Sequence, residues 1–246
     1  DTKQIEVKEK IYLYAEAVKG GSDFDRIKLE SVTEKFDNGV MDLNTGEFTV
    51  FGIKNVDFSP DRFVGLKPFN KQISIQKNRD MDFAGRLFAG YTILLGEDFH
   101  FNYDPFNIES DSAKYFDIYL PIVDAKEEKG KLKPAYPLNS RIENVTGTLL
   151  IDAPLNKSGK DDIAMFPSFQ SQKSSFVFYD DPSIRDGVYN RDSFYVELSP
   201  FSLNSLKSLD RDVVRFKGDV VSSDIFPIFK EEVTIQPDTS LGFVSV

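Results

Sequence analysis

The chain has 246 residues, of which 40% are hydrophobic, and its 23 Phe and 10 Tyr supply large side chains for a core. A formal net charge of −10 argues against nucleic-acid binding, which needs clustered lysines and arginines, and equally disfavours docking on anionic lipid. The absence of cysteine excludes disulfides, thiolate nucleophiles and cysteine-ligated metal sites.

Strand patterns dominate the chain. Residues 27–36 alternate apolar and polar side chains, and the Asn38-Gly39 pair that follows is typical of a tight hairpin turn. A second turn is expected at Asn44-Thr45-Gly46, and the alternation then resumes over 47–58 with a slip near Gly52 that indicates a bulge or corner. Further strands are predicted at 72–77, 86–95, 99–103, 115–123, 147–152, 175–180, 193–199, 213–221 and 232–236.

Helical periodicity is scarce. Leu203, Leu206 and Leu209 recur every three residues and predict a short helix or a 3-10 turn. The charged segment 124–137 contains Gly130 and two prolines, and it predicts a long loop within one unit spanning 1–246 or a break between lobes 1–123 and 138–246.

These patterns together predict an all-β fold with less than about a fifth of its residues in helices. We expect an elongated β-sheet stack or a degenerate β-solenoid, with a β-sandwich as the alternative.

One short sequence motif occurs twice in the chain. FAGRL at 83–87 and FKGDV at 216–220 both read apolar-x-Gly-polar-apolar, and weaker copies surround Gly52 and Gly147. We predict that Gly85 and Gly218 occupy equivalent structural positions, each at a bend or tightly packed crossing where a Cβ atom would not fit.

The densest group of acids lies in the loop-like segment YDDPSIRDGVYNRD, residues 179–192. Its carboxylates form a candidate calcium site, since Ca²⁺ prefers hard oxygen ligands on loops: Asp180, Asp181, Asp186 and Asp192. The spacing does not match an EF-hand, and Arg185 and Arg191 offer the alternative of a solvated turn with simple ion pairs.

No catalytic signature accompanies the single histidine, His100, which strand alternation places on a polar face. Phosphate-binding loops are absent as well. We therefore predict no enzymatic activity and no cofactor apart from the calcium candidate. The competing hypothesis is a carbohydrate-active or carbohydrate-binding module that uses the four aspartates together with Tyr189 and Tyr195.

Several strings in the second half stand in a distinctive order: RIENVTGTLLIDAPLNKSG, FPSF, FVFYDD, GVYNRDSFYVELSPF and RFKGDVVSSDIFPIFKEEVTIQPDTSLGF. Over roughly residues 140–246, with an echo in DFAGRLFAG at 82–90, the chain resembles very large uncharacterised bacterial cell-envelope proteins. Those strings have no known chemistry, so the resemblance carries over no site. The alternating strands with glycine corners also look like the stacked strands of OstA-like lipopolysaccharide-transport proteins, in architecture only.

The resemblance implies a β-rich segment of a periplasmic or cell-surface protein. Its partners would be the rest of the parent chain or other envelope components, with a glycan as a further candidate. The chain begins at Asp1 rather than Met and stops at Val246 in what reads as mid-strand, so we expect an excised or processed fragment. No apolar run approaches the roughly 20 residues of a membrane-spanning helix. The sequence thus predicts a non-catalytic structural or interaction module of a large exported bacterial envelope protein.

Overall fold

The computed structural model describes residues 3–13, 25–32, 37–182, 184–222 and 225–244. The prediction of an all-β fold with little helix is confirmed, because strands hold 51% of the residues and helices hold 5%. In the described ranges no helix reaches seven residues, and the strands form one large antiparallel sheet that is not closed into a barrel.

The bounds of the elements follow the chain. The strands are β1 (Gln4–Val7), β2 (Tyr12–Leu13), β3 (Lys28–Ser31), β4 (Gly39–Asp42), β5 (Phe48–Phe51), β6 (Ile53–Ser59), β7 (Val64–Pro68), β8 (Gln72–Ile75), β9 (Met81–Ala89), β10 (Thr92–Asn102), β11 (Asn107–Pro121), β12 (Ala135–Pro137), β13 (Ile142–Leu150), β14 (Ser168–Ser171), β15 (Ser175–Phe178), β16 (Phe194–Leu198), β17 (Ser202–Leu203), β18 (Arg215–Ser222), β19 (Phe229–Ile235) and β20 (Leu241–Gly242). Short 3-10 helices are η1 (Pro60–Arg62), η2 (Arg185–Gly187), η3 (Leu206–Ser208) and η4 (Arg211–Val213).

The sheet is a meander whose strands bend midway. Two consecutive strands can follow the same course with only a short break between them. β5 and β6 are separated in this way at Gly52, where φ is 74°. The two halves then pair with different halves of the next strand, β5 with β8 and β6 with β7. The long strand β9 pairs with β8 near its start and with β7 near its end. Each such strand therefore contributes to two walls of one sheet.

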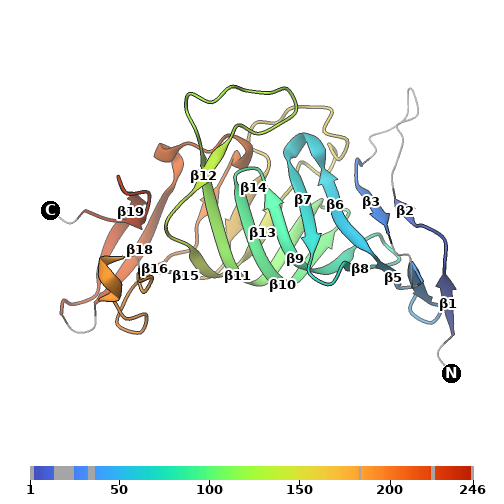
Figure 1. Cartoon of the computed structure of the whole chain (residues 1–246), viewed down its shortest axis with the longest axis horizontal. Coiled ribbons are helices and arrows are strands. Elements are labelled where there is room, and N and C mark those ends of the chain that lie inside the picture. The colour runs from blue at the N-terminus through green and yellow to red at the C-terminus, as the bar shows by residue number, and fades with distance from the viewer. Residues whose placement is uncertain (1–2, 14–24, 33–36, 183, 223–224, 245–246) are drawn as a thin grey trace.

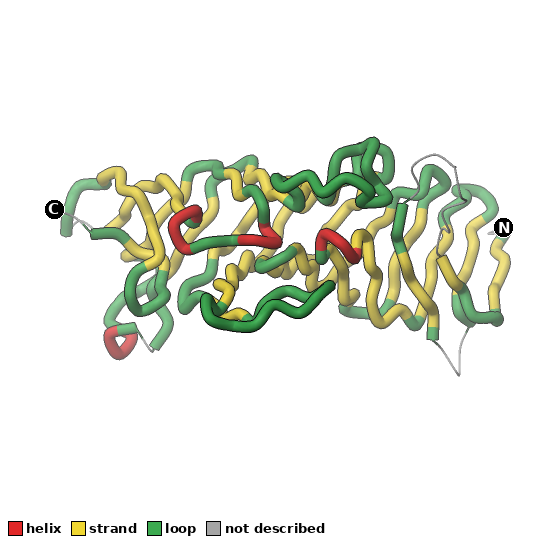
Figure 2. The backbone as a smooth tube through the Cα atoms, turned by 90° about the horizontal axis from the view of Figure 1, so that it is seen from above, coloured by secondary structure: helices red, strands yellow, loops and turns green. Residues whose placement is uncertain are grey.

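The bent sheet forms an elongated trough with the N-terminus at one end and the C-terminus at the other (Figure 1). Seen from above, η1, η3 and η4 lie between two rows of strands, along the open side of the trough (Figure 2). We call these helices, together with the loop 151–167, the cover.

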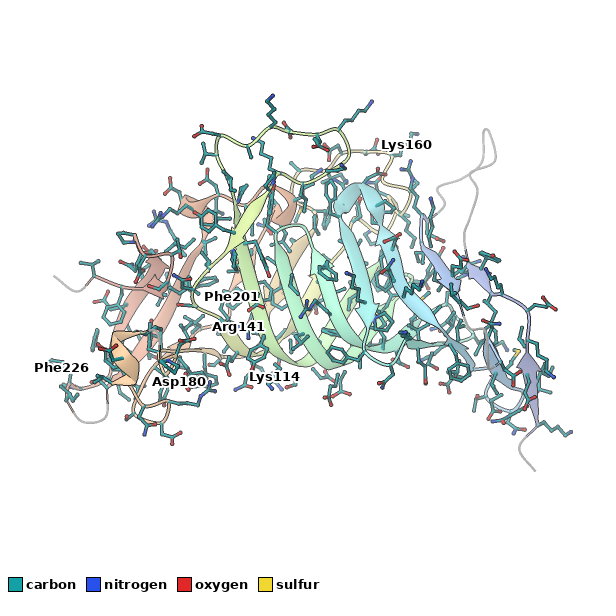
Figure 3. The ribbon with its side chains drawn as sticks, viewed as in Figure 1. Lys114, Arg141, Lys160, Asp180, Phe201 and Phe226 are labelled. Carbon is teal, nitrogen blue, oxygen red and sulfur yellow. The ribbon has the colours of Figure 1, made fainter. Side chains whose placement is uncertain are left out.

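Aromatic side chains fill the trough. Phe58 lies against Phe83 and Phe101, with ring centroids 5.6 and 4.8 Å apart. Farther toward the C-terminal end, Phe169 and Phe201 continue the line of rings, and Phe201, labelled in Figure 3, is buried. One hydrophobic cluster reaches from Ile27 to Leu241 and so extends past the segment 124–137. Such rings bury large apolar areas, which is why the core needs no covalent staples.

One of the two turns expected near the N-terminus is present in the structure. The turn at Asn44-Thr45-Gly46 is confirmed, because Asp42 Oδ1 accepts the Asn44 N–H at 2.7 Å and Gly46 has a φ of 77°.

The hairpin expected at Asn38-Gly39 is wrong. Gly39 begins β4, which pairs with β1 and β5 rather than with β3. The Asn38 amide donates to Lys8 O at 2.6 Å and its Oδ1 accepts from Ser31 Oγ at 3.0 Å. The side chain of Asn38 therefore forms its hydrogen bonds within the sheet and does not stabilise a hairpin turn.

A hairpin inside the predicted strand 86–95 was missed. β9 ends at Ala89 and β10 begins at Thr92, and Gly90 between them has a φ of 54°. A Cβ on Gly90 would lie 2.2 Å from Leu206 O, so this turn is packed against the cover. The leucine-spaced segment does form 3-10 turns, η3 and η4, as expected.

Gly85 and Gly218 both lie inside strands, next to the backbone of a neighbouring strand. A Cβ on Gly85 would lie 2.4 Å from Lys67 O, and one on Gly218 would lie 2.8 Å from Glu197 O. Gly147 is in the same situation, 2.3 Å from Gln170 O. Close backbone approach, rather than a left-handed conformation, is what these positions share.

We predict that Gly85→Val and Gly218→Val each lower the free energy of unfolding by about 1–3 kcal/mol, because the added side chain must displace neighbouring backbone. Urea denaturation measures the effect. The controls are the adjacent substitutions Ala84→Val and Lys217→Val, which place the same side chain where a Cβ already fits. Equal stabilities for the glycine variants and their controls would contradict the prediction.

Candidate functional site

The four aspartates of the 179–192 loop do not converge. Asp180 accepts a hydrogen bond from Arg191 Nε at 2.9 Å, and both terminal nitrogens of Arg191 bind Glu143 at 2.9 and 3.0 Å. The other three aspartates are exposed on the loop, and Asp186 lies within η2. Within the ranges described above, no group of three or more His, Asp or Glu side chains is placed to hold a metal ion. Calcium binding therefore stays a prediction without a gathered ligand set.

Arg191 joins this loop to β13 through Glu143, and it also pairs with Asp180, which is labelled in Figure 3. Its guanidinium also lies 4.1 Å from the centroid of the Phe178 ring, a cation–π contact. The hydrogen bonds that Arg191 donates, to Glu143 first and to Asp180 second, raise the pKa of Arg191. The side chain of Arg185, the other expected partner, lies outside the described residues.

The tyrosines proposed for sugar stacking have phenylalanine neighbours. Tyr189 stacks on Phe194 with ring centroids 4.6 Å apart. Tyr195 packs against Phe176 and Phe178, at 5.9 Å in both cases. Each tyrosine ring thus packs against the protein on at least one side, and both side chains are partly buried.

His100 is held between two carboxylates on the polar face of β10. Its Nδ1 lies 2.5 Å from Asp82 Oδ1, and its Nε2 lies 3.8 Å from Asp80 Oδ2. The hydrogen bond to Asp82 raises the pKa of His100, against the opposing effect of partial burial, and Asp80 adds to the rise. The imidazole of His100 is thus engaged with the carboxylates of Asp82 and Asp80.

A buried arginine in the cover was not predicted. Arg62 is only 2% exposed, and its Nε donates to Asp152 Oδ2 at 2.6 Å. Its terminal nitrogens donate to Asp161 O and to Asp162 Oδ1, both at 2.7 Å. Lys207 in η3 also binds Asp162, at 2.6 Å. We call this set of residues the Arg62 cluster; it joins η1, the loop 151–167 and η3.

The charges of the Arg62 cluster are well satisfied. Asp152 Oδ1 accepts from the Ala153 N–H at 2.8 Å and from Asn156 Nδ2 at 3.0 Å, so both carboxylate oxygens are bound. Lys207 first, and Arg62 second, lower the pKa of Asp162. These contacts tie η1, the loop 151–167 and η3 to one another.

A cavity of about 760 Å³ lies under the loop 122–134, which arches above β11 and β12 in Figure 1. The loop is held at its base, since Ile122 N–H donates to Pro134 O at 2.8 Å and Lys133 N–H donates to the Tyr91 hydroxyl at 3.0 Å. Tyr91 and Leu120 belong to the hydrophobic core and form part of the cavity wall. No sequence pattern marked this site, because its walls come from segments far apart in the chain.

No protein-family model, curated protein or solved structure matches the chain. None of the helices in the described residues has the length and apolarity needed to cross a membrane.

We predict that Arg62→Met lowers the free energy of unfolding by about 3–5 kcal/mol, because it leaves the Asp152 carboxylate buried without its countercharge. The double variant Arg62→Met/Asp152→Leu should recover much of this loss, since it removes both charges together. Asp162→Asn serves as the control and should cost less than about 1 kcal/mol, because Asp162 is 79% exposed. Urea denaturation of the three variants is the measurement, and a double variant as unstable as Arg62→Met would contradict it.

We also predict that His100 contributes to a pH-dependent stability. Because its pKa is raised above the ordinary 6.5 in the folded state, the stabilisation is fully present below pH 6.5 and is lost as the pH rises through the folded-state pKa. The single histidine allows a direct NMR titration. Asp82→Asn should lower the pKa of His100 toward 6.5, whereas the remote Asp219→Asn should leave it unchanged; an unshifted pKa in Asp82→Asn would refute the assignment.

Proposed function

We propose that this chain is a non-catalytic structural or interaction module of a large exported bacterial envelope protein, working through the edges of its sheet. The resemblance of residues 140–246 to envelope proteins supports the setting. The proposed interaction rests on one observation. In the described part of the chain, the outermost strands are hydrogen-bonded to a neighbouring strand on one side only.

The N-terminal edge is the better exposed of the two. β1 pairs with β4 and β2 pairs with β3, and neither has a second partner among the described strands. Ile5, Tyr12 and Leu13 are exposed on this edge. A row of unpaired backbone N–H and C=O groups beside apolar side chains is a template for adding another strand.

The C-terminal edge is shorter and partly folded back. β20 pairs with β19 through only two residues, and Leu241 is also bound by Ser140 Oγ and Tyr179 Oη. Strand addition is therefore favoured at the N-terminal edge. A partner strand there would extend the trough and continue its apolar core, as a structural module requires.

Dispersed acids support the non-catalytic part of the proposal. The carboxylates at 180, 143, 152 and 82 each bind a cation or an imidazole of the protein itself. A screen of glycans for binding and for hydrolysis tests this part directly. Turnover of any glycan that is lost in Asp180→Asn or Asp192→Asn would overturn it.

The edge proposal predicts that the isolated chain associates with itself as its concentration rises, because a second copy can supply the missing strand. Ile5→Lys/Leu13→Lys should weaken this association about tenfold or more, since lysines on an edge oppose strand pairing. Val188→Lys/Leu155→Lys is the matched control, with two exposed apolar residues replaced away from the sheet edges. Sedimentation velocity is the measurement, and a parent chain that remains monomeric throughout would contradict the proposal.

A further inference from the structure

The cavity under the loop 122–134 carries positive charge in an acidic protein. Among its lining residues five are Lys or Arg and three are Asp or Glu. Lys131 is paired with Glu128 at 2.7 Å, and Lys207 is paired with Asp162 at 2.6 Å. Lys129 and Lys133, by contrast, form no ion pair with any described residue. Two ammonium groups at this cavity are thus without an ion pair in the described ranges, as are the carboxylates of Glu127 and Asp210.

Tyr91 adds a buried hydrogen-bond donor. The residue is only 6% exposed, and its hydroxyl oxygen accepts the Lys133 N–H at 3.0 Å. The hydroxyl proton has no acceptor among the described residues. Burial, the largest cause, raises the pKa of Tyr91, so the group stays protonated and able to donate. A buried donor without an acceptor is costly unless a ligand or water completes it.

Part of the wall is apolar. Phe63, Leu120 and Leu209 line the cavity, and the last two are almost completely buried. At the mouth, Ile122 and Val123 expose further apolar surface. A volume of about 760 Å³ lies in the range of small-molecule sites, which combine apolar walls with a few polar groups that orient the ligand.

We propose that this cavity binds a small amphipathic organic anion. Its acidic group, a carboxylate or sulfonate, is held by Lys129, Lys133 and the Tyr91 hydroxyl, and its apolar body lies against Phe63, Leu120 and Leu209. The binding requires no chemistry and leaves the sheet edges free, so it is independent of the structural role proposed above.

The test uses the fluorescent anion 1-anilinonaphthalene-8-sulfonate as the probe. Titration should show one saturable site whose dissociation constant rises with salt, because ion pairs at an open cavity are screened. Lys129→Gln/Lys133→Gln should weaken binding about tenfold or more, consistent with losing charge-assisted contacts. Tyr91→Phe should also weaken it, with a thermal melt to show that the fold is kept.

Two controls separate the cavity from other surfaces. Lys54→Gln/Lys217→Gln removes two exposed lysines elsewhere and should leave binding unchanged. Phe226→Ser removes an exposed ring at the C-terminal end of the trough (Figure 3) and should also leave it unchanged. Binding that survives the loss of Lys129 and Lys133, or that disappears in Phe226→Ser, would overturn the proposal.

Discussion

Every long strand of this sheet must turn a corner without losing the hydrogen bonds to its neighbours. The corner is made by interrupting the strands, as at Gly52, and by register shifts, such as the one between Gly96 and Phe99 on β10. Glycines without a Cβ then let adjacent strands approach closely, and Gly85 and Gly147 lie where such contacts are tightest. Once both walls are in place, their inward side chains face each other, and the rings of Phe58, Phe83 and their neighbours can fill the space between.

The trough has one open side, and the Arg62 cluster supplies its closure. Burying an arginine is costly unless it is paired and hydrogen-bonded, and here each of its three nitrogens donates one hydrogen bond, to Asp152, Asp161 and Asp162. The same cover packs against the hairpin turn at Gly90 and leads into the wall of the cavity beyond η3. The polar tie thus holds the short helices over the aromatic core.

The sequence could predict what local patterns determine. Alternation identified many of the strands but not β7 or β14. The turn at 44–46 follows from its residue types, and the repeated Phe-x-Gly phrase indicated positions that the structure shows to be crowded. It could not reveal contacts between distant segments. Asn38-Gly39 has the composition of a turn, but Val7 and Lys8 offer partners from another strand. Arg62 and Asp152 are ordinary loop residues in the sequence, and only the folded sheet brings them together.

The meander has a consequence for the order in which the molecule forms. Because β9, β10 and β11 each pair with their neighbours along the chain, the sheet can grow by successive hairpins, and such local pairing favours rapid folding. The cover cannot form by local pairing, because the hydrogen bond from Arg62 to Asp152 joins residues that are 90 positions apart in the chain. During synthesis the half-built trough would therefore expose its phenylalanines until residue 152 and the loop after it have emerged, and that interval is when the nascent chain most needs protection from aggregation.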